Sequence, residues 1–453
     1  MITGAFERAR QAYFKPLGRR ELERQAADAD ARELGESQWW SNGRLRAYQA
    51  ERLARLLDHA GRHTAWYGRH FSELGRGGGG DPWETLASFP VLHKRDLQVS
   101  GVELVADNAA ALGAFHNQTG GSTGERVQLK QSRRYHDRAM RQIERGFAWC
   151  GFQPGDSHVF VWGSDVDSRE HAGAVAAWRD FWHWHRLWVN TFDLSWSSLA
   201  GVVARLRLLR PRFLFGYVSS LAMVAHAIEA LGETAVCPIA VETTAELLSP
   251  DHRRHLERVL GCEVFDRYGC REVGNIAHEC GAHAGLHSLA ESNLVEVLEL
   301  GADRPAAPGE LGRIVVTNLD NWAQPMLRYE VGDLGRLLPG ACPCGRGLPR
   351  LRVEAGRLGD VLEGPSGRLL HSEFFTHLFY GHPGVWQFEV VQDGADHLRV
   401  RVVPGPGYDD RVRHTVTEQI LTNGDPAFRV TWEVVEGIAP AKSGKYRFVR
   451  REP

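Results

Sequence analysis

The middle of the chain alternates short apolar runs with longer amphipathic stretches, and this alternation most constrains the fold. Runs rich in β-branched and aromatic residues are typical of buried strands. The longer amphipathic stretches between them are typical of helices. The expected strands are residues 158–162, 213–215 and 262–266, and the expected helices are 199–209 and 221–231. Strands that alternate with helices build α/β layers whose sheets are mainly parallel. We therefore expect an α/β fold.

The flanking regions differ from this middle part. Leucines recur at helical spacing from Leu45 to Leu57, whereas residues 294–298 and 312–317 predict closely spaced strands. Strand patterns return after residue 360. We expect a large N-terminal domain, residues 1–359, with layered sheets and helices. It would include a β-rich, zinc-bearing subdomain at about 278–350, and a small, mobile α+β domain would follow at 360–453.

Length and composition exclude several classes of protein. A chain of 453 residues is too long for one core. Lys and Arg number 54 against 56 for Asp and Glu, so no net field favours nucleic acid or an anionic membrane. No apolar run reaches the ~18–20 residues that span a bilayer. Seven cysteines, an odd number that clusters late, predict reduced thiols and a cytoplasmic protein.

Five short motifs carry the chemistry. They are Gln118-Thr-Gly-Gly-Ser-Thr-Gly-Glu125, Tyr268-Gly-Cys-Arg-Glu272, Arg328-Tyr-Glu-Val-Gly-Asp333, Gly356-Arg-Leu-Gly-Asp360 and Ser443-Gly-Lys-Tyr-Arg447. The first can offer backbone N–H groups and hydroxyls to phosphates. A glutamate such as Glu272 can ligate Mg²⁺, and Asp333 can accept hydrogen bonds from a ribose diol. Any one of them alone is also typical of an ordinary polar turn.

Together and in this order, the motifs resemble those of the adenylate-forming superfamily. Residues 86–97 and 309–329 resemble the phenylacetate–CoA ligase branch, and the Tyr-Gly-Cys-Arg-Glu variant is similar to its capsular-polysaccharide-type members. The resemblance implies an ATP-dependent, AMP-forming ligase. It would activate a small, aromatic or otherwise apolar carboxylic acid as an acyl-adenylate and transfer the acyl group to CoA.

The resemblance also implies roles for single residues. Lys445, Glu272 and Thr123 would be catalytic, with Mg²⁺ on Glu272, and Asp360 would be the hinge. The residues expected to bind ATP are Thr119, Gly120, Gly121, Ser122, Thr123, Gly124, Ala245, Glu246, Tyr268, Gly269, Asp333 and Arg357. Arg126-Val127 stands where the phosphate loop of the family usually has Pro-Lys, so no lysine is assigned there.

The cysteines form a separate pattern. Cys342-Pro-Cys344 lies about sixty residues after Cys280, which His287 follows closely. Three thiolates and one imidazole complete a tetrahedral zinc site, and relatives in the branch resemble this arrangement and carry a structural zinc. We expect Cys280, His287, Cys342 and Cys344 as ligands. The alternatives to His287 are His278, His283 and Cys270.

The sequence leaves the acceptor and the acid open. The same adenylation step serves an amine or another small nucleophile instead of CoA, and the acid need not be a carboxylate. A non-catalytic nucleotide- or acyl-binding protein is the alternative of another class, and a homodimer is compatible with the sequence. Residues 178–188 hold four tryptophans, which on one continuous helix would pack as i,i+4 pairs or line a pocket.

Overall fold

The computed structural model describes residues 2–73, 80–118, 127–163, 171, 173–191, 194, 196–234, 236–355, 361–371, 374–375, 378–379, 382, 384–405, 407–439 and 448–452. The chain separates into two compact units. Unit 1 comprises residues 1–156 and 265–354, and unit 2 comprises residues 157–264 and 355–453. The predicted domain boundary between residues 359 and 360 lies outside the described residues and stays a prediction.

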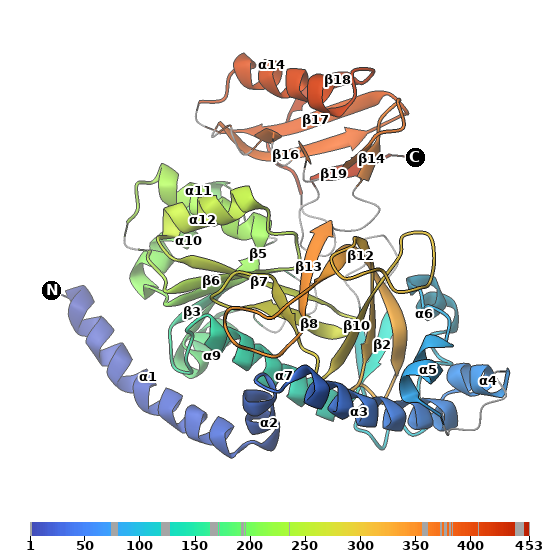
Figure 1. Cartoon of the computed structure of the whole chain (residues 1–453). Helices are drawn as coiled ribbons and strands as arrows, with labels where there is room; N and C mark the ends of the chain where they lie inside the picture. The colour runs from blue at the N-terminus through green and yellow to red at the C-terminus, as the bar shows by residue number, and fades with distance from the viewer. Residues whose placement is uncertain are drawn as a thin grey trace. The chain divides into compact units, whose positions relative to one another are not determined.

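Unit 1 combines an N-terminal helical segment with a run of strands (Figure 1). Its helices are α1 (Ile2–Ala27), α2 (Ala29–Ser37), α3 (Asn42–His63), α4 (Ala65–Glu73), α5 (Pro82–Ala87), α6 (Lys94–Ser100) and α7 (Arg133–Trp149). Its main strands lie in the order β10 (Asn293–Leu298), β11 (Gly312–Asn318), β12 (Met326–Leu338), β13 (Arg350–Ala355), β9 (Leu286–Ser288), β8 (Gly274–Glu279) and β7 (Glu263–Cys270). A small antiparallel sheet pairs β1 (Phe115–Gln118) with β2 (Gln128–Gln131).

Helix α3 illustrates how the sequence builds the core of unit 1. Its N-cap is Ser41, whose side chain accepts the N–H of Arg44. Leu53, Leu56 and Leu57 are buried on one helix face. They pack in one cluster with apolar residues of β8, β10, β11 and β12. Each buried leucine stabilises the fold by about 1.5–3 kcal/mol, so this face holds the helix against the strands.

Buried charges fix α2 against α7. Arg138 of α7 is 1% exposed and donates to Asp30 at 2.5 Å and to Glu33 at 2.6 Å, both on α2. Arg145, two turns further along α7, donates to Glu291 at 2.6 Å. Removing one partner of a buried ion pair leaves an unpaired charge, so these positions tolerate substitution poorly.

Unit 2 contains a parallel sheet with crossover helices, as the alternating sequence pattern predicts. The sheet order is β6 (Ala240–Thr244), β5 (Phe213–Tyr217), β3 (His158–Trp162) and β4 (Arg186–Asn190). The helices are α9 (Ala174–Trp184), α10 (Trp196–Leu209), α11 (Val218–Ala230) and α12 (Pro250–Leu260). Val159, Val161 and Leu214 share one buried cluster with residues of α10, α11 and α12. One face of the sheet is therefore covered by these helices.

The C-terminal part of unit 2 is a four-stranded sheet with a helix on one face (orange to red in Figure 1). The order is β18 (Arg429–Val434), β17 (His397–Pro404), β16 (Val385–Gln392) and β19 (Val449–Arg451). β14 (Val361–Glu363) pairs with β15 (Leu369–His371), and α14 (Asp410–Gln419) continues into a π turn, η3 (Ile420–Gly424). Val412 and Val416 of α14 pack against Val390 and Val400 of the sheet.

The predicted α/β class is confirmed, and each strand and helix expected from the sequence overlaps an element of that type, with ends that agree to within a few residues. The tryptophan-rich segment is an exception. Its helix ends at Trp184, because His185 adopts the left-handed conformation with φ 52° and β4 begins at the next residue. Trp178 and Trp184 are 65% and 54% exposed, so these two rings do not pack in a core.

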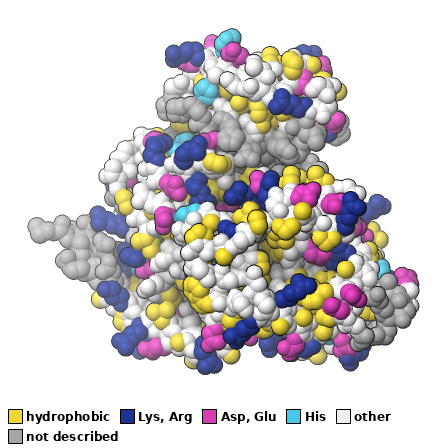
Figure 2. All heavy atoms as spheres, in the orientation of Figure 1, with side chains coloured by type: hydrophobic (Ala, Val, Ile, Leu, Met, Phe, Trp, Pro, Cys, Tyr) yellow, Lys and Arg dark blue, Asp and Glu magenta, His cyan; other side chains and the backbone are white. Residues whose placement is uncertain are grey.

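Two surface properties bear on binding partners. None of the helices in the described ranges is both long and apolar enough to span a bilayer. Basic and acidic side chains are interspersed on the face that Figure 2 shows, in keeping with their near-equal numbers in the sequence.

Candidate functional site

The turn that joins β7 to β8 presents Glu272. Cys270 pairs with Gly274 at the end of this hairpin. Gly274 has φ +77°, and a Cβ there would lie 2.2 Å from the Tyr135 hydroxyl oxygen. A Cβ on Gly269 would lie 2.6 Å from the Gly274 carbonyl oxygen. Both positions require glycine, so the hairpin is tight and holds the half-buried Glu272 at its tip.

Strand β12 supplies the partners of the hairpin. The Tyr268 hydroxyl donates to Asp333 Oδ2 at 2.7 Å, and the Tyr329 hydroxyl donates to Glu272 Oε1 at 3.3 Å. Asp333 directly follows Gly332, whose φ of +91° marks a local departure from extended backbone. The structure thus joins Tyr268 to Asp333, two predicted site residues that are 65 positions apart, and β12 also contacts the predicted Glu272 through Tyr329.

A half-buried thiol, that of Cys270, lies near the Glu272 carboxylate. Burial, together with the nearby Glu272 carboxylate, raises the pKa of Cys270 well above its ordinary range. Burial also raises the pKa of Tyr135, and the charges of neighbouring acidic groups add to the effect. Both groups remain protonated at neutral pH, so neither serves as a nucleophile here.

The predicted adenine segment lies in unit 2, at the carboxyl edge of the parallel sheet. Ala245 directly follows β6 and has φ +71°, a left-handed conformation that is uncommon for alanine. Glu246 accepts the backbone N–H of Ser219 at 2.7 Å and its hydroxyl at 2.9 Å. Ser219 lies in the first turn of α11, so Glu246 caps the N-terminus of that helix. Ligands of α/β proteins bind at this edge.

Three aromatic rings lie near the same edge of unit 2. Trp162 ends β3, and its ring centroid is 4.7 Å from that of Tyr217 and 5.5 Å from that of Phe215. The Tyr217 hydroxyl donates to the Gly163 carbonyl oxygen at 2.6 Å, which fixes the ring at the end of β5. Phe215 and Tyr217 are buried, so the three rings form a packed apolar group beside the carboxyl edge.

The remaining predicted site residues lie outside the described residues and stay predictions. They are the phosphate-loop residues Thr119, Gly120, Gly121, Ser122, Thr123 and Gly124, together with Arg357, the hinge Asp360 and Lys445.

A second group of polar side chains in unit 1 contains the four predicted zinc ligands. The potential ligand atoms of Cys280, His287, Cys342 and Cys344 all lie within 4.8 Å of one another. The sulfur atoms of Cys280 and Cys342 are 3.8 Å apart, and Cys344 Sγ is 3.3 Å from His287 Nε2. The first three residues are buried, so the cluster is closed to solvent on most sides.

The surroundings orient the imidazole of the cluster. His287 Nδ1 lies 3.2 Å from the Leu348 carbonyl oxygen, which favours a proton on Nδ1 and leaves Nε2 toward the cysteines. The Trp149 ring packs edge-on at 5.6 Å. Of the alternative ligands, His283 lies 3.2 Å from Glu279. Among the described residues, His278, His283 and Cys270 do not belong to the cluster.

Comparisons with known proteins agree with this geometry. Residues 362–452 match the family model described as the CapK C-terminal domain. A phenylacetate-coenzyme A ligase of Pseudomonas putida is 26% identical over 354 residues, which cover 74% of this chain and 75% of that protein. Protein CapK of Staphylococcus aureus is 20% identical over 88% of each chain.

A solved structure shares the fold over nearly the whole chain. It is 2-hydroxyisobutyryl-CoA ligase in the postadenylation state in complex with R3-HIB-AMP, with a TM-score of 0.73, 20% identity and 92% of each chain covered. The chain is thus similar in sequence to phenylacetate-coenzyme A ligases and to CapK, and it shares its fold with an acyl-CoA ligase.

Two residues of the site were not predicted from the sequence. Tyr329 stands inside the 328–333 motif, one residue before Glu330 and four before Asp333, and had no assigned role. In the structure its hydroxyl donates to Glu272. Ser219 belongs to no motif, and only the tertiary structure brings it to Glu246.

Proposed function

We propose that the chain activates a small carboxylic acid with ATP and transfers the acyl group to CoA. The observation that carries the proposal is that two motifs meet in the structure: Tyr268 of the β7–β8 hairpin donates to Asp333 of β12, and Tyr329 of β12 donates to Glu272 of the hairpin. Two half-buried carboxylates, each oriented by a tyrosine hydroxyl, suit a magnesium nucleotide, because one can take the metal and the other the ribose. The relatives named phenylacetate-coenzyme A ligase support the same reaction.

The chain would supply each part of the adenylation step. A carboxylate oxygen of the acid attacks the α-phosphorus of ATP, and the bond to pyrophosphate breaks. Glu272 would hold the Mg²⁺ that neutralises the phosphates, and Asp333 the ribose. Residues 119–124 would donate to the phosphate oxygens, and Lys445 would stabilise the negative charge that develops on the α-phosphate.

The aromatic rings in unit 2 support an apolar acid. Trp162 and Tyr217 end β3 and β5 at the carboxyl edge of the parallel sheet, where α/β enzymes bind their substrates, and Phe215 packs against Trp162. An aromatic ring stacked in this region would gain about 0.5–1.5 kcal/mol beyond burial of its area. We therefore propose an aromatic acid ahead of a short aliphatic one.

The Cys/His cluster fits a structural zinc ion. With Zn–S bonds of about 2.3 Å, tetrahedral geometry places two sulfur ligands roughly 3.8 Å apart. The separation of Cys280 and Cys342 has that value. His287 and Cys344 would complete the four ligands, and such a closed site stabilises the fold without contacting substrate.

We also propose that residues 360–453 form a domain that rotates about Asp360. The match of residues 362–452 to a separate family model supports the boundary. Rotation would bring Lys445 to the α-phosphate for adenylation and then withdraw it to admit the acceptor.

Pyrophosphate exchange tests the proposed reaction. The full chain with ATP, Mg²⁺ and labelled pyrophosphate, without CoA, should form labelled ATP only when its acid is present. The panel should contain phenylacetate, benzoates and 2-hydroxyisobutyrate. Addition of CoA should then yield the thioester and AMP. Exchange without thioester formation would mean that another nucleophile, and not CoA, accepts the acyl group. Release of ADP in place of AMP would contradict the proposal.

Substitution of Lys445 tests the proposed mechanism most directly. We expect Lys445→Ala to lower the exchange rate by about 10²–10³-fold, because a charge that stabilises the transition state is lost. Lys442→Ala is the matched control, since it removes the same charge three residues earlier, and it should keep most of the activity. Equal rates for both variants would remove Lys445 from the mechanism.

A further inference from the structure

A group of polar side chains in unit 2 joins α11 to α12. His226 and Glu229 stand three residues apart on α11 and therefore on one helix face. His255 reaches them from α12, and its ring centroid is 4.2 Å from that of His226. One potential ligand atom from each of the three residues lies within 4.8 Å of the others.

Only one of the two ring nitrogens of His255 has a hydrogen-bond partner among the described residues. Arg258 donates to His255 Nδ1 at 3.0 Å and to Glu229 Oε1 at 2.6 Å. A guanidinium only donates, so the ring must carry its proton on Nε2. That Nε2 atom is buried and has no hydrogen-bond partner among the described residues. A buried donor without a partner destabilises the site as it stands.

We propose that His226, Glu229 and His255 bind a divalent transition-metal ion of the zinc class. Two imidazoles and one carboxylate form the ligand set of open zinc sites, which keep a fourth position for water. Imidazole favours Zn²⁺, Ni²⁺ and Cu²⁺ over Mg²⁺ and Ca²⁺. This site is separate from the Cys/His cluster, which lies in unit 1.

Arg258 acts as a competing cation in this site. If the ion binds His255 Nδ1, it replaces the guanidinium directly. If the ion binds Nε2, the proton moves to Nδ1, which can then no longer accept from Arg258. In both cases the guanidinium must leave His255, and its charge repels the incoming ion. Arg258 is 61% exposed and can swing into solvent, so binding is expected to be reversible.

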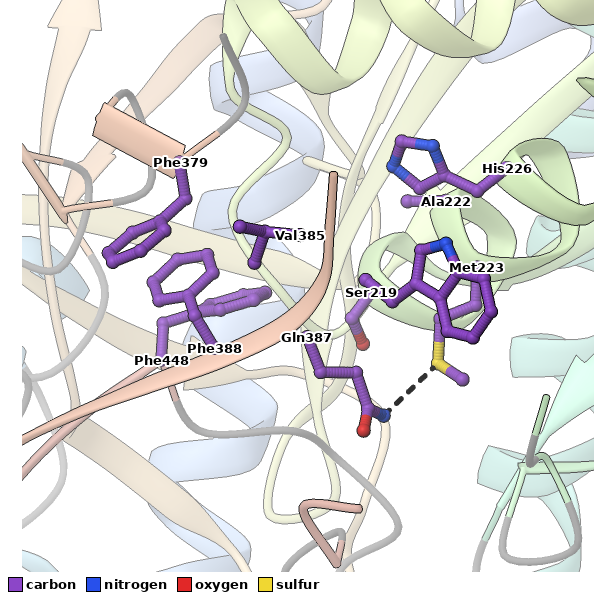
Figure 3. A pocket seen from close by; sticks show the side chains of 10 residues that line it. Ser219, Ala222, Met223, His226, Phe379, Val385, Gln387, Phe388 and Phe448 are labelled. Carbon is purple, nitrogen blue, oxygen red and sulfur yellow. Dashed lines mark hydrogen bonds between the residues drawn. The ribbon is translucent and has the colours of Figure 1, made fainter. Parts of the chain in front are cut away.

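The site adjoins a cavity of unit 2. His226 lines it together with Met223 of α11 and with Val385, Gln387 and Phe388 of β16 (Figure 3). Gln387 Nε2 lies 3.6 Å from Met223 Sδ across this cavity. An ion on His226 would therefore fix a side chain that faces the C-terminal sheet of the same unit.

Calorimetric titration of the full chain with Zn²⁺, after loosely held metal has been removed on a chelating resin, tests the proposal. We expect one equivalent of Zn²⁺ to bind beyond the metal that the protein retains, and Mg²⁺ not to bind there. His226→Ala and His255→Ala should each weaken this binding at least tenfold, whereas His183→Ala, on the exposed face of α9, should not change it.

The Arg258→Ala variant tests the proposal by the direction in which the Zn²⁺ affinity changes. It should tighten Zn²⁺ binding about tenfold, because it removes the competing guanidinium. The matched control is Arg254→Ala, four residues earlier on α12, whose side chain pairs with Asp251 and not with the cluster. Since Arg258 is exposed, its variant should fold even if a histidine variant does not. Weaker or unchanged binding in Arg258→Ala, or no second equivalent in either arginine variant, would overturn the proposal.

Discussion

The two polar sites of unit 1 are built in opposite ways. In the Cys/His cluster three of the four ligands are buried, and their sulfur and nitrogen atoms face one another. At the β7–β8 hairpin, Tyr268, Glu272 and Asp333 are only half-buried, and each carboxylate accepts from a tyrosine hydroxyl. A closed site can contribute to folding but not to turnover, whereas an open site can do the reverse. Substitutions should therefore separate the two effects.

The largest effect is expected from the closed site. Cys342→Ser should remove the metal and lower the free energy of unfolding by more than about 4 kcal/mol, because it breaks a structural metal site in the core. Thermal unfolding and zinc content per chain measure this. Cys237→Ser, at an exposed thiol in unit 2, is the control and should change stability by less than about 0.5 kcal/mol. A Cys342→Ser protein that keeps its zinc and its stability would remove the distinction between the sites.

The open site should show the opposite pattern. Glu272→Gln keeps the size of the side chain but removes the charge that we assign to Mg²⁺. We expect pyrophosphate exchange to fall about 10²–10³-fold, with zinc content unchanged and the free energy of unfolding within about 1 kcal/mol of the parent.

Added Mg²⁺ should restore part of the exchange activity, since the remaining ligands bind the ion more weakly. Glu84→Gln, an exposed glutamate of unit 1, controls for loss of charge alone. A Glu272→Gln protein that is fully active, or that unfolds as readily as Cys342→Ser, would contradict the contrast between the sites.

Much of the architecture could be predicted from the sequence, because it depends on local patterns. The strand from 158 to 162 is rich in valine and aromatic residues, and the leucines of α3 recur at helical spacing, so both elements have a clear signature. The Cys-x-Cys pair with Cys280 and His287 upstream predicted the cluster, because these residue types at this spacing have few other uses.

The features that were not predicted depend on tertiary contacts. Glu246 accepts from Ser219, 27 residues away, and no pattern links them. The same holds for His226 and His255, because only the packing of α11 on α12 brings the two rings together. The tryptophan-rich run is a different case. Its spacing fits one continuous helix, but the left-handed His185 ends that helix and Trp188 lies in a strand.

The smallest effect is expected within the open site itself. Tyr268→Phe keeps the ring and removes only the hydroxyl that donates to Asp333 at 2.7 Å. One such hydrogen bond contributes about 0.5–1.5 kcal/mol. If it orients Asp333 toward the ribose, the KM for ATP should rise roughly 3–10-fold while zinc content stays constant. Tyr13→Phe, on the exposed surface of α1, is the matched control and should leave the KM unchanged. An unchanged KM in Tyr268→Phe would mean that β12 alone positions Asp333, and a large loss of stability would mean that the hairpin, like the cluster, is primarily structural.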